Sequence, residues 1–229
     1  MRNIAKALSL SGLVLATPVL AEGPVVVELY TSQGCSACPP ADALLHELAE
    51  RPDIIALSLH VDYWDYIGWK DSFADPSHAQ RQHGYARAAN GTTVYTPQMI
   101  INGVDHVVGS RPMEVADALR NHWDKAPDVD VTLTRADDVL IIDATAQTAG
   151  DYIVQMIRYS EDETVDIRRG ENAGRVINYT NVVTSLDEIG TWDGQAALNM
   201  SVQIEGDAPS VVLIQHSGNG PIAGAAELE

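Results

Sequence analysis

Residues 25–40 have the sequence VVVELYTSQGCSACPP, in which an apolar run leads into a Cys-x-x-Cys motif. The β-branched run Val25–Tyr30 predicts a buried strand. Residues 31–34 are typical of a turn. A helical stretch, Ala41–Glu50, follows the motif, with Asp42 off its apolar stripe. We therefore expect the cysteines at the start of a helix, whose free N–H groups and positive dipole end favour a thiolate.

The chain contains no cysteines besides Cys35 and Cys38. A structural disulfide across so short a loop would stabilise the chain by only about 2 kcal/mol in the chain-entropy model. Thiol–disulfide exchange instead needs an attacking thiolate and a second thiol close by. We predict that Cys35 is the exposed nucleophile and that Cys38, one helical step further in, is the resolving cysteine. A structural disulfide and a metal site remain alternatives at this point.

The N-terminus has the pattern of a signal peptide. Arg2 and Lys6 precede the apolar run Ala7–Ala16, and small residues surround Ala21. We expect residues 1–21 to be removed by cleavage after Ala21. The mature protein is then expected to be periplasmic or secreted, where disulfides persist.

Composition narrows the range of partners. The 229 residues carry a formal net charge of −18, and such an acidic surface repels nucleic acid. No run reaches the roughly twenty apolar residues that span a bilayer, so no membrane span is expected in the mature protein. We expect protein or small-molecule thiols and disulfides as partners, and no cofactor.

A second apolar run, Ile54–Val61, predicts another buried strand and completes a parallel β-α-β unit. Residues 62–71 follow it and are rich in aromatic side chains, among them Tyr63 and Trp64. Because they begin at the carboxyl end of a strand, they could form the wall of a substrate site beside the dithiol. Packing of these aromatic side chains to anchor the loop is the alternative. Ser72–Ala89 then has helical character.

A Thr-Pro dipeptide, Thr96-Pro97, stands just before the next apolar strand and follows Tyr95. That strand ends in an Asn-Gly turn at residues 102–103, and a returning strand follows. A helix over residues 111–123 closes this half of the chain. The predicted order is β-α-β-α-β-β-α.

This order, with Cys-x-x-Cys after the first strand and Thr-Pro before the third, resembles the thioredoxin fold over residues 23–125. The resemblance implies that Pro97 is a cis-proline packed against the dithiol. It also implies that Thr96 presents backbone groups to a bound peptide, with Tyr95 beside it. The sequence departs from thioredoxin itself because no Trp precedes Cys35 and the intervening pair is Ser-Ala rather than Gly-Pro.

More narrowly, the chain is similar to the bacterial exported family known as domain of unknown function 1223. The similarity rests on distinctive segments at residues 30–42, 60–71, 95–103 and 169–172. It implies no established reaction.

After a linker at Ala126–Asp128 the helical periodicity disappears. Short alternating or apolar runs take its place at residues 129–134, 139–146, 152–159, 196–204 and 210–215. Their spacing predicts a β-sandwich over residues 129–229. The predicted fold is thus an α/β thioredoxin-like domain followed by an all-β sandwich-like domain.

Within the second half, residues 168–174 form the most polar segment and include Arg169 and Glu171. Such a segment indicates a turn network in which Glu171 and Asn172 satisfy backbone groups. Alternatively, it is a loop that leans over the dithiol or contacts a partner.

Taken together, these patterns predict an exported thiol–disulfide oxidoreductase. A Cu(I)-binding or copper-delivery protein is the first alternative, with Cys35, Cys38 and His60 as ligands, because thiolates favour Cu(I) and zinc. A closed zinc site would need a fourth ligand, for which Asp62 is a poor candidate. A non-catalytic binding module is the second alternative.

Overall fold

The computed structural model describes residues 23–123 and 125–228. The predicted signal peptide, residues 1–21, lies outside these ranges. Within them no helix is long and apolar enough to cross a membrane. The elements are β1 (Val25–Thr31), α1 (Pro39–Ala49), β2 (Ile54–His60), a 3₁₀ turn η1 (Asp65–Ile67), α2 (Pro76–Ala88), β3 (Gln98–Ile101), β4 (Asp105–Val108), α3 (Pro112–Trp123), β5 (Val129–Ala136), β6 (Val139–Ala146), β7 (Tyr152–Ile167), β8 (Arg175–Trp192), β9 (Leu198–Gln203), β10 (Ser210–His216) and β11 (Ile222–Leu228).

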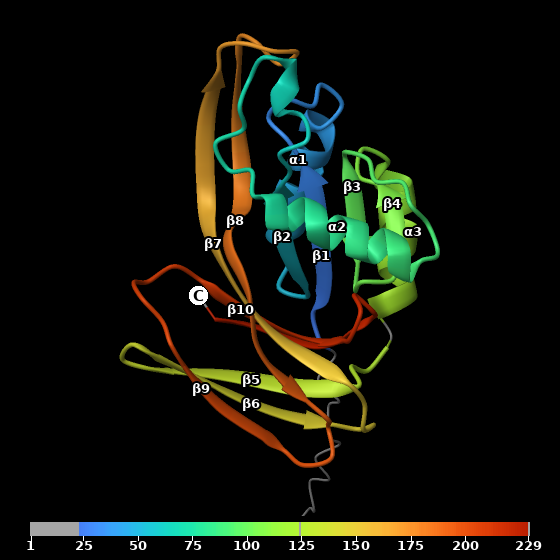
Figure 1. Ribbon diagram of the computed structural model, residues 1–229, viewed down its shortest axis with the longest axis vertical. Helices are drawn as coiled ribbons and strands as arrows, with labels where there is room; N and C mark the ends of the chain where they lie inside the picture. The colour runs from blue at the N-terminus through green and yellow to red at the C-terminus, as the bar shows by residue number, and fades with distance from the viewer. Residues whose placement is uncertain (1–22, 124, 229) are drawn as a thin grey trace, which may run out of the picture.

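One sheet of eight strands dominates the molecule, in the order β11-β10-β7-β8-β2-β1-β3-β4 (Figure 1). β1 and β2 pair in parallel over their full length, and α1 is the crossover helix that connects them. β2 also pairs in parallel with β8, and the remaining neighbours are antiparallel. A second, antiparallel sheet contains β5, β6 and β9.

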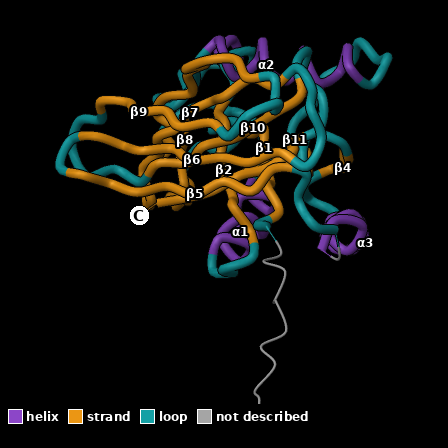
Figure 2. The backbone as a smooth tube through the Cα atoms, turned by 90° about the horizontal axis from the view of Figure 1, so that it is seen from below, coloured by secondary structure: helices purple, strands orange, loops and turns teal. Residues whose placement is uncertain are grey.

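The helices cover both faces of the large sheet. α1 and α3 lie on one face and α2 lies on the other (Figure 2). Alternate residues of β1 enter the two layers: Val27 and Leu29 pack with α1 and α3, whereas Val26 and Tyr30 pack on the side of α2. Because successive side chains of a strand point to opposite faces, a strand covered on both faces is apolar throughout. This explains why Val25–Tyr30 is apolar apart from Glu28, whose buried carboxylate is paired with Arg81.

The predicted fold class is wrong, because the large sheet does not stop at the linker. β7, β8, β10 and β11 follow the linker in sequence, yet they extend the sheet that β1–β4 begin. The reason lies in β2, all of whose residues are buried. In the predicted thioredoxin-like arrangement β2 would be an edge with unpaired backbone groups. In the structure β8 pairs with it, and the Asn181 amide donates a hydrogen bond to the Ala56 carbonyl at 3.0 Å.

The smaller sheet packs against the part of the large sheet built after the linker. Leu140 and Ile142 of β6 join Val154 of β7 and Val212 of β10 in one apolar core. The prediction of a separate sandwich is therefore also wrong, because the smaller sheet packs on strands that belong to the large sheet.

Candidate dithiol site

Cys35 and Cys38 form a disulfide in the turn between β1 and α1. Cys38 is the N-cap residue of α1, so the motif lies where strand and helix meet, as predicted. Pro39 and Pro40 occupy the first helical positions. Proline fits there because those N–H groups have no partner inside the helix. Because proline has no N–H, these residues do not supply the free backbone donors that we expected near the sulfurs. The helix dipole remains to favour a thiolate.

The expectation of an exposed Cys35 is wrong. Cys35 is 2% exposed and Cys38 is fully buried. The two residues between them, Ser36 and Ala37, are exposed. The disulfide therefore lies just beneath Ser36 and Ala37. A reaction partner can reach the sulfurs only if the residues around them move.

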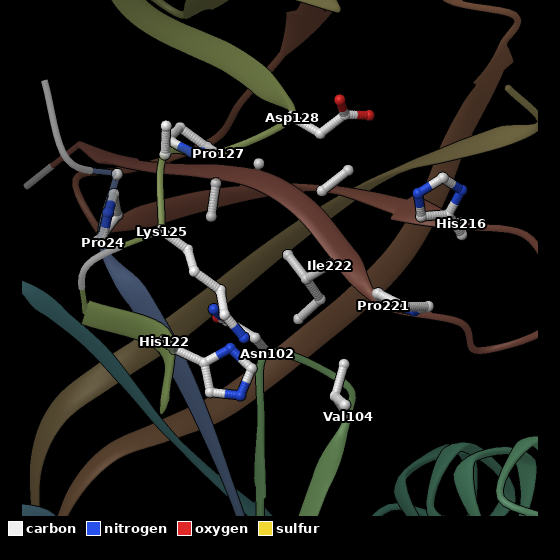
Figure 3. Close-up of a pocket in the computed structure, with 15 residues that line it drawn as sticks. Pro24, Asn102, Val104, His122, Lys125, Pro127, Asp128, His216, Pro221 and Ile222 are labelled. Carbon is white, nitrogen blue, oxygen red and sulfur yellow. The ribbon is translucent and has the colours of Figure 1, made fainter. Parts of the chain in front are cut away.

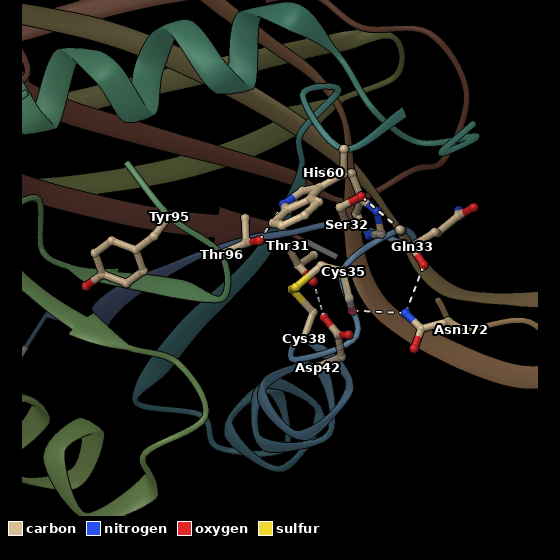
Figure 4. Close-up of a disulfide and its surroundings, with 12 residues drawn as sticks. Thr31, Ser32, Gln33, Cys35, Cys38, Asp42, His60, Tyr95, Thr96 and Asn172 are labelled. Atoms are coloured by element: carbon tan, nitrogen blue, oxygen red, sulfur yellow. Dashed lines mark hydrogen bonds between the residues drawn. A yellow bond between two sulfur atoms is a disulfide. The ribbon is translucent and has the colours of Figure 1, made fainter. Parts of the chain in front are cut away.

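The Thr96–Pro97 peptide bond is cis, as the resemblance implied. Pro97 is buried, and its carbonyl accepts a hydrogen bond from Gly109 at 3.0 Å. Figure 4 places Thr96 to one side of the disulfide, while the ring of Tyr95 points away from it. The Tyr95 carbonyl is occupied by the amide of Gln82 at 2.8 Å. The structure thus brings Thr96, but not the Tyr95 ring, to the disulfide.

Trp64 connects the two sides of the dithiol. Its indole N–H donates to the Thr96 hydroxyl at 2.7 Å. Its Cβ and carbonyl pack on Gly34, where an added Cβ would lie 3.2 Å from the Cβ of Trp64. The side chain therefore spans from the residue before Cys35 to the residue before Pro97. Tyr63 does not join it, because its hydroxyl donates to Gln82 of α2 at 3.1 Å.

We expect Trp64→Ala to speed reduction of the disulfide by dithiothreitol. The substitution removes the indole and its hydrogen bond to Thr96, worth about 1 kcal/mol, so the segments on either side of the disulfide should separate more readily and the rate should rise roughly fivefold to tenfold. Stopped-flow loss of disulfide measures it. Tyr66→Ala is the matched control, because Tyr66 is 80% exposed and stacks on Trp64 without holding Thr96. Equal rates for wild type and Trp64→Ala would show that Trp64 does not limit access.

Gln33 holds the loop that carries Cys35, and sequence reasoning missed it. Its backbone N–H donates to Asp71 at 2.7 Å. Its side chain accepts from the Trp69 indole at 2.7 Å and donates to Ser72 at 3.0 Å. Polar residues in a turn gave no signal of these contacts, since all three partners lie nearly forty positions away.

The tip of the β7–β8 hairpin also reaches the dithiol. The Asn172 side-chain amide donates to the carbonyls of Gln33 and Cys35, both at 2.9 Å (Figure 4). Asn172 is buried, whereas Arg169 and Glu171 are exposed on the same tip. The predicted loop thus does lie against the dithiol, but Asn172 makes the contact. Its amide satisfies backbone carbonyls, as a turn network would, and those carbonyls belong to the loop that carries the dithiol.

His60 lies buried behind the disulfide at the end of β2. Its Nδ1 is 2.8 Å from Asp71, and its ring meets the edges of Phe73 and Tyr179. Burial alone would raise the pKa of Asp71. The hydrogen bond and charge of His60, with backbone donors, outweigh burial and hold that pKa below its usual value. No set of three His, Cys, Asp or Glu side chains within the described ranges is arranged to hold a metal ion. The proposed Cys35–Cys38–His60 ligand set thus has no geometric support.

Asp42 is the second site residue that the sequence did not indicate. It is buried, although its place off the apolar stripe suggested solvent. The Thr31 hydroxyl donates to its Oδ1 at 2.7 Å. Burial raises the pKa of Asp42 to about 7, against the hydrogen bond of Thr31 and the charge of His60. Its position four residues after Cys38 was the available signal, because that spacing places both on one helix face.

A cavity of about 260 Å³ lies elsewhere, between the start of β1, the end of α3 and β11 (Figure 3). Lys125, His122 and His216 are among its lining residues. No cysteine lines it, so it does not serve the dithiol.

Comparison with known proteins adds the following. Residues 26–215 match the family described as "Protein of unknown function (DUF1223)". A search of curated proteins finds no match. A crystal structure of a protein from Agrobacterium tumefaciens, a target of the Northeast Structural Genomics Consortium, matches with a TM-score of 0.78 and 34% identity. The match covers 89% of this chain and 93% of that one. These descriptions name no reaction.

Proposed function

The chain belongs to the DUF1223 family, and from its dithiol site we propose that it is an exported thiol–disulfide oxidoreductase acting on protein or small-molecule thiols and disulfides. The observation that carries the proposal is the Cys35–Cys38 disulfide at the N-cap of α1, just beneath exposed residues. Residues from distant parts of the chain, Trp64 and Asn172, converge on the same loop.

The reaction follows from thiol–disulfide chemistry. When the protein oxidises a substrate, the substrate thiolate attacks Sγ of Cys35, the internal S–S bond breaks, and Cys38 leaves as a thiolate. A second substrate thiolate then displaces Cys35, so the substrate gains a disulfide and the protein becomes a dithiol. The reverse sequence reduces a substrate disulfide. In both directions Cys35 is the cysteine that bonds to the substrate. Cys38 leaves Cys35 when the substrate is oxidised and attacks it when the substrate is reduced.

The prolines leave no N–H donors at the first helical positions of α1. The helix dipole is therefore the feature of α1 that stabilises a thiolate there. A helix terminus contributes about 0.3–1 kcal/mol at exposed sites and up to ~2 kcal/mol when partly buried. Each 1.4 kcal/mol corresponds to about 30 mV for this two-electron couple. No basic side chain lies between the cysteines to add to this effect, so we propose a middling reduction potential.

The test is a mixed-disulfide trap with Cys38→Ser. Reduced Cys38→Ser should attack substrate disulfides through Cys35 and stay attached, because no second thiol can release the substrate. Non-reducing electrophoresis of periplasmic extract, followed by mass spectrometry, should show adducts at Cys35. The matched Cys35→Ser variant should show none. If Cys38→Ser forms no adducts and its Cys35 reacts with iodoacetamide no faster than a free thiol, the proposal is wrong.

A further inference from the structure

Buried polar atoms without partners gather behind the disulfide. Within the described part of the chain, Oδ2 of Asp42, Nε2 of His60 and the Tyr179 hydroxyl are buried and make no hydrogen bond. They come from α1, β2 and β8, and the rings of His60 and Tyr179 are 4.8 Å apart. An unpaired buried polar atom is costly, so such a cluster calls for an explanation.

Asp42 is the member that lies next to the dithiol. Its backbone N–H donates to the Cys38 carbonyl at 3.1 Å, so it follows Cys38 by one helical turn. Residues four positions apart lie on the same face of a helix. Figure 4 shows the Asp42 carboxyl group beside Cys38, with Thr31 holding one of its oxygens. The other oxygen, Oδ2, is the one without a partner.

We propose that Asp42 is the proton acceptor of Cys38 when the mixed disulfide is resolved, an inference that rests on the proposed oxidoreductase function. In this step Cys38 attacks Sγ of Cys35, and its S–H proton moves to Asp42. The bond between Cys35 and the substrate sulfur breaks, and the substrate leaves as a thiolate. The internal disulfide is formed and Asp42 ends protonated. In the reverse direction Asp42 returns the proton to the Cys38 thiolate.

The surroundings of Asp42 suit this role. A buried thiol has no solvent to take its proton, so a base must be supplied from within the protein. The titratable groups that face Asp42 are His60 of β2, Asp71 of the following loop and Tyr179 of β8. Burial and Asp71 raise the pKa of Asp42, while Thr31 and His60 lower it, and the balance is about 7. A base is most effective when its pKa lies near the working pH.

The experiment uses dithionitrobenzoate (DTNB) and the reduced full-length mature chain. Attack by Cys35 releases a first thionitrobenzoate, and attack by Cys38 on the resulting mixed disulfide releases a second. In Asp42→Asn the second release should slow about 10²-fold, since general base catalysis contributes that much or more, while the first release should be unchanged. The matched control is Glu47→Gln, an exposed carboxylate on the same helix, in which both releases should match wild type.

The pH profile separates proton transfer from a merely structural effect. In wild type the rate of the second release should rise through about pH 7 as Asp42 loses its proton. Asp42→Asn should lose that inflection. Thr31→Val removes a hydrogen bond to the charged carboxylate, so its inflection should move to higher pH. An unchanged second release and inflection in Asp42→Asn, or an unmoved inflection in Thr31→Val, would overturn the role of Asp42. A wild-type protein that never releases the second thionitrobenzoate would instead contradict the oxidoreductase function itself.

Discussion

Replacing Arg81 with methionine is expected to lower the free energy of unfolding by about 3–5 kcal/mol, because it leaves a buried carboxylate without its partner. Arg81 lies on α2 and donates to both carboxylate oxygens of Glu28 on β1, at 2.6 and 3.3 Å. Both side chains are almost completely buried. Burial alone would lower the pKa of Arg81, but the charge of Glu28 raises it well above its usual value, so Arg81 keeps its charge in this buried position.

The same pair joins the two halves of the sheet. Arg81 also donates to Gln155 of β7 at 3.1 Å and to the Tyr85 hydroxyl at 2.8 Å. That hydroxyl donates to Glu28 and accepts from Gln215 of β10 at 2.9 Å. One ion pair thus connects α2 with strands on both sides of the linker. Its loss should weaken the whole large sheet rather than one helix.

Urea unfolding, monitored by circular dichroism, measures the effect. The urea concentration at the midpoint should fall while the dependence of the unfolding free energy on urea stays unchanged. The double variant Glu28→Gln/Arg81→Met is the control. It removes the unpaired charge, so it should be more stable than Arg81→Met alone. If Arg81→Met alone costs less than about 1 kcal/mol, the pair is no more than a surface-type ion pair and the argument fails.

The sequence predicted the local elements of the first half well, for a clear physical reason. The two apolar runs became β1 and β2, and the Cys-x-x-Cys motif came to lie at the start of α1. Such features depend on residues near one another in the chain. The sheet order does not. The hairpin strand β8 has no strong apolar alternation, and its pairing with β2 joins residues such as Ser58 and Val182. Periodicity carries no information about which distant strand a backbone edge will accept.

The candidate site shows the same division. Cys35 and Cys38 could be selected from their spacing, whereas Pro97 and Thr96 came from the resemblance to the thioredoxin fold. The groups that position them come from afar: the Asn172 amide reaches Gln33 across 139 positions. Its neighbours Arg169 and Glu171 were the site residues predicted from this segment, yet both are exposed, because charge keeps a side chain in solvent. A neutral amide such as that of Asn172 can be buried when it donates to backbone carbonyls. Burying a charged side chain without an oppositely charged partner costs much more free energy.

Replacing Gly224 with alanine is expected to destabilise the contact between the two sheets by about 3 kcal/mol, the upper part of the usual range for overpacking. An added Cβ would lie 2.1 Å from the Val129 carbonyl oxygen and 3.0 Å from the Val129 Cβ. Most of this obstacle is backbone, which cannot rotate away as a side chain can. Val129 begins β5 and is buried in the core shared by both sheets, so β5 would have to move.

Because the dithiol lies at the opposite end of β1 from this contact, Gly224→Ala should release thionitrobenzoate at wild-type rates while hydrogen exchange accelerates in β5, β6 and β9. Gly190→Ala is the matched control. Its Cβ would meet only the flexible end of Met200, at 2.9 Å, and should cost little. Equal exchange in Gly224→Ala and wild type would mean that the sheets tolerate separation. A slowed dithiol reaction would mean instead that the smaller sheet supports the reactive loop, which the present contacts do not indicate.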